Sequence, residues 1–257
     1  MLQFVFKFKK KISQIYKEKG ITSLILKPFS SFKQLFFVLY TRSKIKKLQK
    51  TYTLKSLIEY SLKVNNGFIK PTQRRSEILK LLTLIKREKP KYILEIGTAS
   101  GGTLFLLTRT IAKDAVIISI DLPGGSYGGG YSELKLPLYR AFRLPKQKLF
   151  LIRANSHSTA TLNQLKRILN GNYLDFLFID GDHSYKGAKM DFEMYTPLVK
   201  KNGIVALHDI AYSPPEISEV YKFWEEIKKN YEYKEFIEER DKKGYGIGIV
   251  RLNKKLT

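Results

Sequence analysis

The 257-residue chain has 43% hydrophobic residues, 47 Lys and Arg against 23 Asp and Glu, and no cysteine. This length and apolar share fit one α/β domain with an appendage and argue against wholesale disorder. Without cysteine, the chain cannot use disulfides, thiolate metal sites or cysteine nucleophiles. Residues 1–90 contain 22 Lys and Arg but only 4 Asp and Glu, so a polyanionic partner is expected for this part of the chain.

Residues 1–75 are predicted to form a basic, helical N-terminal extension. Its aromatic and aliphatic residues recur at helical spacing: Phe29, Phe32, Leu35, Phe36, Leu39 and Tyr40. Lys33 and Arg42 bracket the most apolar stretch, Leu35 to Tyr40, which is too short for a membrane-spanning helix, so none is expected. The first twenty residues lack a small-residue cleavage site and carry their charges after the apolar residues, unlike a secretory signal. These features predict a cytoplasmic protein.

Residues 76–257 are predicted to form an α/β domain, because short β-rich runs alternate with helical stretches after a helix at 76–87. The expected strands are 92–97, 115–122, 148–154, 174–180, 203–208, 233–238 and 245–252. The expected helices are 102–111, 133–142, 161–169, 186–199 and 217–231. The last two strands follow each other directly across a polar turn at 240–244, which favours antiparallel pairing at a sheet edge. The predicted fold is a Rossmann-like, doubly wound, seven-stranded and mostly parallel sheet with an antiparallel last strand.

The first predicted strand runs into a glycine turn that opens a helix, with Glu95, Gly97 and Gly101 in the pattern E-x-G-x-x-x-G. Glycine lets a backbone approach a ligand closely, and a helix start offers unpaired N–H groups. The next strand ends in Asp121, where a carboxylate can accept hydrogen bonds from both hydroxyls of a ribose. Gly97 and Gly101 are one residue closer together than the first and last glycines of the dinucleotide motif G-x-G-x-x-G, and this spacing disfavours a dinucleotide pyrophosphate.

This pattern resembles the class I S-adenosylmethionine-dependent methyltransferases, and the resemblance extends over about residues 76–252. It implies that the turn residues line the methionine side of the cofactor and that Asp121 holds the ribose. It also implies that Asn155 and Ser156, after the third strand, meet the adenine. The residues assigned to the cofactor on this basis are Glu95, Gly97, Ala99, Ser100, Gly101, Asp121, Asn155, Ser156 and Asp180.

A second group of polar residues follows the fourth and fifth predicted strands. Asp180 and His183 lie in the string F-I-D-G-D-H-S-Y, and His208 and Asp209 end the fifth strand. Because carboxyl ends of neighbouring parallel strands meet at one sheet edge, these groups are expected to lie together. Asp180, His208 and Asp209 could hold Mg²⁺ or another divalent cation. Helix capping by the acidic residues is the ordinary structural alternative.

The same strings are similar to those of the small-molecule and sugar O-methyltransferases related to macrocin O-methyltransferase and the cephalosporin hydroxylase group. In metal-dependent relatives, an acid after the fourth strand and an acidic pair after the fifth bind magnesium. Asp180 and Asp209 match this pattern, whereas His208 replaces a carboxylate or amide. Both a metal-assisted mechanism and a metal-free one with a histidine base are therefore kept, with His183, His208 and Asp180 as the catalytic candidates.

The predicted function is O-methylation of a hydroxyl on a sugar, a glycan or another small-molecule intermediate. Two alternatives stay open: a ribose-directed RNA methyltransferase and a non-catalytic, basic surface-binding protein. Nucleic acid is the less favoured partner, because cytosine C5 methylation needs a cysteine and the base-amino methylation motif is missing after the fourth strand. The aromatic residues between lysines in the extension suit an anionic membrane surface, such as the inner face of the cell membrane. Packing on the domain itself, or in a homo-oligomer, is the alternative.

Overall fold

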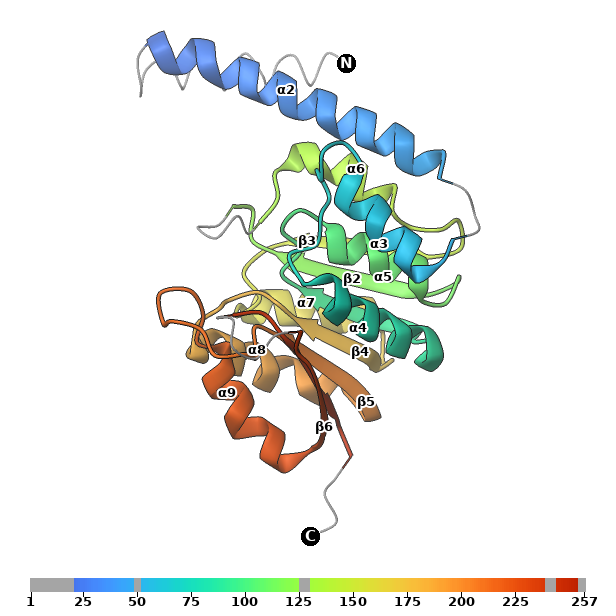
Figure 1. Ribbon diagram of the computed structural model, residues 1–257, viewed down its shortest axis with the longest axis vertical. Helices are drawn as coiled ribbons and strands as arrows, with labels where there is room; N and C mark the ends of the chain where they lie inside the picture. Colours follow the sequence, from blue (N-terminus) through green and yellow to red (C-terminus); the bar gives the residue numbers. More distant parts are fainter. Residues whose placement is uncertain (1–20, 49–51, 125–129, 239–243, 254–257) are drawn as a thin grey trace.

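The structure is a computed structural model that describes residues 21–48, 52–124, 130–238 and 244–253 (Figure 1). Its centre is a seven-stranded sheet in the order β3-β2-β1-β4-β5-β7-β6. The strands are β1 (Tyr92–Ile96), β2 (Val116–Asp121), β3 (Lys148–Arg153), β4 (Leu174–Ile179), β5 (Val199–His208), β6 (Glu232–Phe236) and β7 (Ile247–Arg251). The first five strands are parallel, and β7 pairs antiparallel with β5 and β6. The predicted fold class is confirmed.

Helices cover both faces of the sheet. They are α2 (Ile21–Lys46), α3 (Leu54–Lys63), α4 (Arg75–Glu88), α5 (Gly102–Thr110), α6 (Leu136–Arg140), α7 (Thr159–Leu169), α8 (Tyr185–Tyr195) and α9 (Val220–Ile227). Short 3₁₀ turns at Glu133–Lys135, Thr196–Leu198 and Lys228–Asn230 shorten three of the predicted helices. Proline at the start of α6 and within the turn after α8 accounts for two of these breaks. Residues 239–243 of the predicted polar turn lie outside the described residues.

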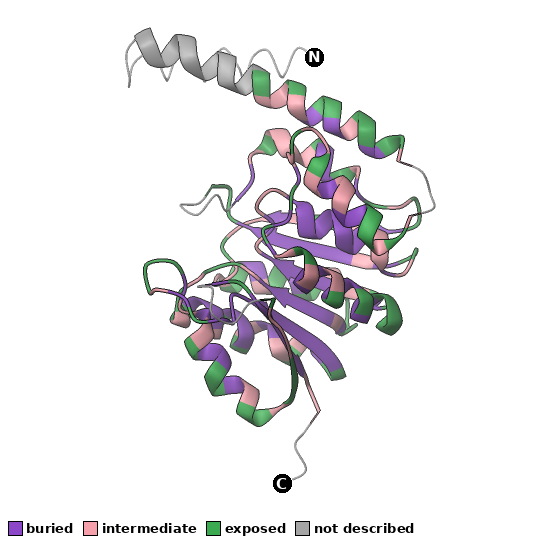
Figure 2. Cartoon of the chain, viewed as in Figure 1, coloured by how far each residue is buried: buried purple, intermediate pink, exposed green. Residues whose placement is uncertain are grey.

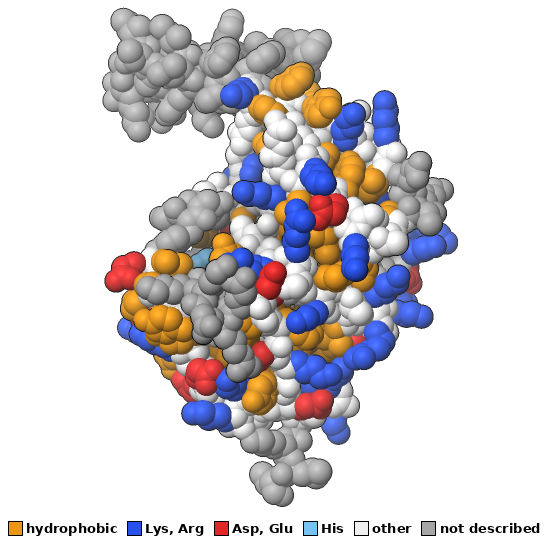
Figure 3. All heavy atoms as spheres, viewed as in Figure 1, with side chains coloured by type: hydrophobic (Ala, Val, Ile, Leu, Met, Phe, Trp, Pro, Cys, Tyr) orange, Lys and Arg blue, Asp and Glu red, His pale blue; other side chains and the backbone are white. Residues whose placement is uncertain are grey.

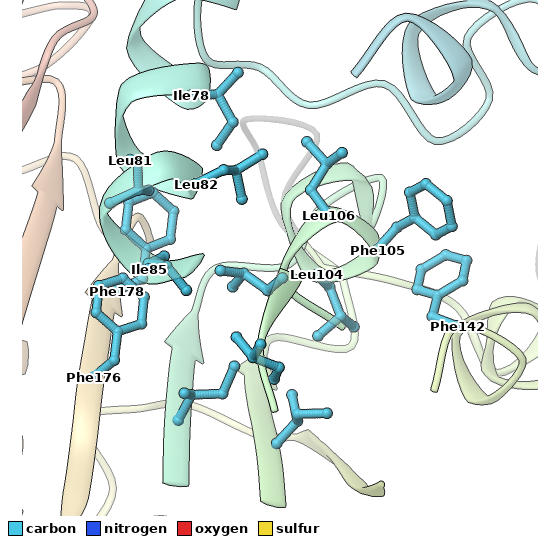
Figure 4. Packing of buried hydrophobic residues seen from close by; sticks show 14 of the residues in the cluster. Ile78, Leu81, Leu82, Ile85, Leu104, Phe105, Leu106, Phe142, Phe176 and Phe178 are labelled. Atoms are coloured by element: carbon cyan, nitrogen blue, oxygen red, sulfur yellow. The ribbon is translucent and has the colours of Figure 1, made fainter. Parts of the chain in front are cut away.

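Alternation along the strands divides the core between the two faces, because successive side chains of a strand point in opposite directions. Ile93 of β1 joins a cluster with α4 and α5, whereas its neighbour Leu94 joins a cluster with α7, α8 and α9. Figure 4 shows Phe176 and Phe178 of β4 packed against the α4 side chains. Strands β1, β2, β4 and β7 are buried along most of their length, whereas the edge strands β3 and β6 are mostly half-buried or exposed (Figure 2). This double burial holds the carboxyl ends of β1, β2, β4 and β5 at one edge.

The N-terminal extension is packed onto this core. Val38 and Ile45 of α2 and Leu57 of α3 belong to the same apolar cluster as α4 and α5. Helix α2 lies against α6 (Figure 1). The apolar cluster therefore runs across the predicted boundary between residues 75 and 76. Among the described residues, no helix combines the length and the hydropathy needed to cross a bilayer.

Candidate active site

The turn after β1 is held by two glycines in left-handed backbone conformations. Gly97 has φ +90° and Gly101 has φ +84°, values that residues with a Cβ rarely adopt. A Cβ on Gly97 would lie 1.8 Å from the main-chain oxygen of Asp180, and one on Gly101 would lie 2.6 Å from the Tyr139 ring. Close packing inside the protein therefore accounts for both glycines. Their predicted contact with a cofactor stays a prediction.

The two residues between these glycines that were assigned to the cofactor are tied to other segments. Ala99 has φ +45°, and its carbonyl accepts a hydrogen bond of 2.7 Å from the Tyr139 hydroxyl. The Ser100 hydroxyl donates to the carbonyl of Lys70 at 2.5 Å. The turn is thus fixed by helix α6, which carries Tyr139, and by the segment that leads into α4, which carries Lys70.

Asp121, at the end of β2, uses both carboxylate oxygens to hold this turn. One oxygen accepts hydrogen bonds from the amides of Thr98 and Ala99 at 2.8 and 2.7 Å. The other accepts from the amides of Leu122 and Gly130 at 2.7 and 2.9 Å. A carboxylate has about four acceptor positions, so these four amides occupy the group. A ribose contact, as the sequence predicts, would require one of these amides to be replaced.

Glu95 is the most deeply placed carboxyl near the turn. It is fully buried in the middle of the sheet, and neither of its oxygens makes a hydrogen bond of good geometry with a described residue. Burial raises the pKa of this carboxyl well above its usual range, and the negative charges of Asp180 and Asp121 raise it further. The Thr98 and Ser119 side chains beside it offset only part of this effect. Glu95, Asp121 and Asp180 therefore bring three carboxyl groups together at this edge of the sheet.

The loop after β3 is clamped by helix α8. The Tyr195 hydroxyl donates to the carbonyl of Ser156 at 2.6 Å, and His157 Nε2 lies 3.3 Å from a carboxylate oxygen of the fully buried Asp191. Asn155 closes the loop locally, because its side-chain oxygen accepts from the His157 amide at 2.9 Å. Pairing with Asp191 raises the pKa of His157. The clamp was not predicted from the sequence.

Four of the predicted site residues do meet at the carboxyl ends of β4 and β5. His208 Nδ1 lies 3.0 Å from Asp180 Oδ1 and 3.1 Å from Asp209 Oδ1. His183 Nδ1 lies 3.3 Å from Asp209 Oδ2, and its Nε2 lies 3.8 Å from Asp180 Oδ1. Each imidazole therefore bridges the same two carboxylates.

The two histidines differ in exposure. The side chain of His208 is 3% exposed, whereas that of His183 is 28% exposed. Burial alone would lower the pKa of His208, but the charges of Asp180 and Asp209 outweigh it and raise the pKa to about 9. His208 is therefore the buried imidazole, whose protonated form the two carboxylates favour, and His183 is the imidazole that solvent can reach.

One set of side chains among the described residues has its donor atoms close enough for a metal ion. Atoms of Asp180, His183 and Asp209 lie within 4.8 Å of one another. The sequence predicted the two carboxylates of this set but named His208 in place of His183. The difference arises because His208 Nδ1 is already held between the carboxylates, while its Nε2 is buried without a hydrogen-bond partner in the described part of the chain.

Gln73 is a site residue that the sequence did not reveal. Its side chain is almost fully buried, and its Nε2 donates to Asp180 Oδ2 at 2.6 Å. Its Oε1 accepts from the Thr103 hydroxyl of α5 at 2.7 Å. Gln73 thus connects the segment before α4 with the acid that ends β4. No local motif marks such a residue, because its partner Asp180 lies 107 positions away.

Comparison with known proteins shows what this arrangement is similar to. Residues 94–210 match the family described as a methyltransferase domain. A protein of Acanthamoeba polyphaga mimivirus, described as uncharacterised, is 31% identical over 138 residues, which are 52% of this chain and 60% of that protein. A protein of Sinorhizobium fredii, also described as uncharacterised, is 24% identical over 148 residues, which are 56% of this chain and 16% of that protein. The chain thus spans less than two thirds of either relative.

Two solved structures share the fold. An O-methyltransferase from Bacillus cereus, in complex with SAH, superimposes with a TM-score of 0.56 at 17% identity, over 77% of this chain and 91% of that one. The O-methyltransferase TomG from Streptomyces achromogenes, described as involved in tomaymycin synthesis and in complex with SAM, gives 0.54 at 17% identity, over 80% and 92%. These likenesses establish the architecture of the sheet and its helices.

Proposed function

We propose that the protein binds S-adenosylmethionine and methylates a hydroxyl group, because residues 94–210 match a methyltransferase-domain family and the fold is shared with an O-methyltransferase. The acceptor in this proposal is a sugar, a glycan or another small-molecule intermediate. The observation that carries it is the acid and imidazole cluster of Asp180, His183, His208 and Asp209 beside the β1 turn. This cluster combines proton acceptors with the negative charge that a cationic methyl donor requires.

The cofactor is supported by the charge at this sheet edge. S-adenosylmethionine carries an ammonium group and supplies a methyl group on a positively charged sulfonium. The buried Glu95 carboxyl lacks a well-formed hydrogen bond, and Asp121 and Asp180 lie near enough to raise its pKa. A cationic ligand would relieve the repulsion among these three carboxyls. The neighbours from Bacillus cereus and Streptomyces achromogenes are described as complexes with SAH and SAM.

A divalent cation is compatible with the same cluster. Asp180, His183 and Asp209 offer two carboxylate oxygens and one imidazole nitrogen within 4.8 Å, a donor set that suits Mg²⁺ or Mn²⁺ with remaining positions for other oxygens. A metal ion held there would stabilise the negative charge of a hydroxyl that is losing its proton. The carboxylates are already brought together by His208, so the site needs little rearrangement.

The residues of the chain have distinct tasks in this proposal. In the metal-free form of this proposal, His183, the more exposed imidazole, accepts the proton of the acceptor hydroxyl, and Asp209 orients its ring and stabilises the charge that develops on it. His208, on the buried side of the cluster, holds Asp180 and Asp209 in place. Gln73 fixes the second oxygen of Asp180. With S-adenosylmethionine bound, the methyl group would pass from the sulfonium sulfur to the acceptor oxygen and leave S-adenosylhomocysteine, and in-line positioning would contribute most of the rate.

The test of this proposal is a calorimetric titration of the protein with S-adenosylmethionine and, as a comparison, with NAD. Mn²⁺ is titrated separately into wild type, Asp209→Asn and a matched control, Asp182→Asn. Asp182 is an exposed acid two residues from Asp180, and its carboxylate accepts a hydrogen bond of 2.9 Å from the Ser184 amide. Selective binding of S-adenosylmethionine, with Mn²⁺ binding weakened only in Asp209→Asn, supports the proposal.

The acceptor is tested by incubation with methyl-labelled S-adenosylmethionine and separate pools of sugars, glycans and RNA. Label in the sugar or glycan fraction supports the proposed acceptor class. Label in RNA would instead favour the ribose-directed alternative. The 22 Lys and Arg of residues 1–90 could bind RNA phosphates in that case. A protein that binds neither S-adenosylmethionine nor S-adenosylhomocysteine would contradict the proposed activity.

A further inference from the structure

The outward face of α2 combines large apolar side chains with lysines. Phe36 is 61% exposed, Leu39 is 50% exposed and Tyr40 is 43% exposed. Lys33 precedes and Lys44 follows these residues at helical spacing, and both are exposed. Figure 3 shows hydrophobic and basic side chains next to each other over the described part of this helix. We call Lys33, Phe36, Leu39, Tyr40 and Lys44 the outer face of α2.

The opposite side of the helix fixes its orientation. Val38, Thr41 and Ile45 follow one another at three- and four-residue spacing and are fully or almost fully buried. The Thr41 hydroxyl accepts a hydrogen bond of 2.8 Å from the Asn65 side chain, and the Phe37 ring stacks on Phe68 at 5.7 Å. The outer face is therefore held away from the domain by packing on the inner one.

The aromatic residues of the outer face are ordered among themselves and with a lysine. The rings of Phe36 and Tyr40 are stacked at 6.2 Å, and Lys44 Nζ lies 5.3 Å from the centre of the Tyr40 ring. This places a cation at the end of an apolar patch, with a flexible stem that can extend past it. Side chains of this kind lie well at the boundary between acyl chains and headgroups, where the rings are buried and the ammonium groups reach the phosphates.

The charge around the helix has one sign. Between Glu18 and Glu59 the sequence contains 9 Lys and Arg and no Asp or Glu. Anionic lipids attract such a segment by about fivefold in affinity for each Lys or Arg near the surface. Since both the apolar and the cationic parts of the outer face need a complement, we propose that α2 docks the protein on an anionic lipid surface, with Phe36, Leu39 and Tyr40 inserted at the headgroup boundary.

Other occupants fit this face less well. A second copy of the chain would pair equivalent surfaces across a two-fold axis, and this would bring the lysines of both copies together. Nucleic acid would neutralise the lysines through its phosphates but would leave Leu39 and the Phe36 edge without an apolar partner. A lipid layer complements both kinds of side chain at once.

The test is co-sedimentation of the full-length protein with vesicles of phosphatidylcholine alone and with vesicles that also contain phosphatidylglycerol. We expect binding only to the anionic vesicles. Replacing Phe36, Leu39 and Tyr40 together by Ser should weaken binding at least tenfold, because burial of each large side chain is lost. Replacing Lys33, Lys44 and Lys47 together by Gln should weaken it about 100-fold.

Matched variants control for charge and exposed apolar surface in general. The control for apolar surface combines Tyr173→Ser with Met190→Ser, two residues that are exposed elsewhere on the domain. The control for charge combines Lys86→Gln, Lys166→Gln and Lys234→Gln. These controls should bind like wild type, and thermal melting should show that all variants are folded. Binding that is equal for the outer-face and control variants would overturn the proposal. So would tight binding to RNA without binding to vesicles, or a dimer in analytical ultracentrifugation that the Phe36, Leu39 and Tyr40 variant abolishes.

Discussion

Replacement of Gly97 by Ala tests the close approach of β1 and β4, on which the site depends. The added Cβ would lie 1.8 Å from the main-chain oxygen of Asp180 and 2.9 Å from the amide of Gly181. Because Cβ atoms do not come within 3.0 Å of such atoms, the two strand ends would have to separate. This movement would strain the hydrogen bonds from the Gly97 amide to Ile120 at 2.9 Å and from the Asp180 amide to Ile96 at 2.8 Å.

The expected cost has two parts. A left-handed φ costs alanine about 1–2 kcal/mol relative to glycine. Overpacking and weakened hydrogen bonds add about 2–4 kcal/mol. Gly171 is the matched control, because its φ is +82° but a Cβ there would meet nothing within 4 Å. Gly171→Ala should therefore lose only the first part of the free energy of unfolding.

The assay is urea denaturation of both variants and wild type, followed by fluorescence of Trp224, which is fully buried. We expect Gly97→Ala to lose about 3–6 kcal/mol of the free energy of unfolding, and Gly171→Ala about 1–2 kcal/mol. Gly97→Ala should also bind S-adenosylmethionine more weakly than wild type, if the proposed cofactor site is correct. Equal losses in the two variants would refute the close packing at Gly97 and the role given to that glycine.

Three further predictions concern the hydrogen bonds of the site. Gln73→Glu places a second carboxylate against Asp180, and the two repel each other most when both are ionised. Urea denaturation without metal should therefore show a larger loss of stability for this variant at pH 8 than at pH 5. Gln73→Ala should lose about 1–3 kcal/mol at both pH values. The pKa of His157 is raised by Asp191, so the stabilisation by this pair is complete below the unfolded-state value of about 6.5 and is lost as the pH rises through the folded-state value. His157→Asn should therefore differ from wild type more at pH 6 than at pH 9, and a constant difference would argue against the ion pair. Asp121→Asn should lower the melting temperature of the ligand-free protein, because the carboxamide cannot accept from all four amides; an unchanged melting temperature would indicate a role limited to ligand binding.

The sequence by itself determined the order and type of the strands. Short β-branched and aromatic runs such as 92–96 and 174–179 are buried on both faces, so they have no competing helical pattern. The direct succession of β6 and β7 determined the antiparallel edge. Because parallel strands bring their carboxyl ends to one edge, the sequence also predicts that Asp180 and Asp209 lie together.

The contacts of each polar side chain depend on tertiary packing and could not be predicted from the sequence. The sequence could not choose between His183 and His208, because the direction of a side chain at a strand end depends on the following loop, here with Asp209 at φ +61°. It could not show that Asp121 holds the β1 turn, or that Gln73 reaches Asp180. Residue type and spacing determine local structure through short-range backbone preferences, whereas contacts over 107 positions exist only after the whole core has packed.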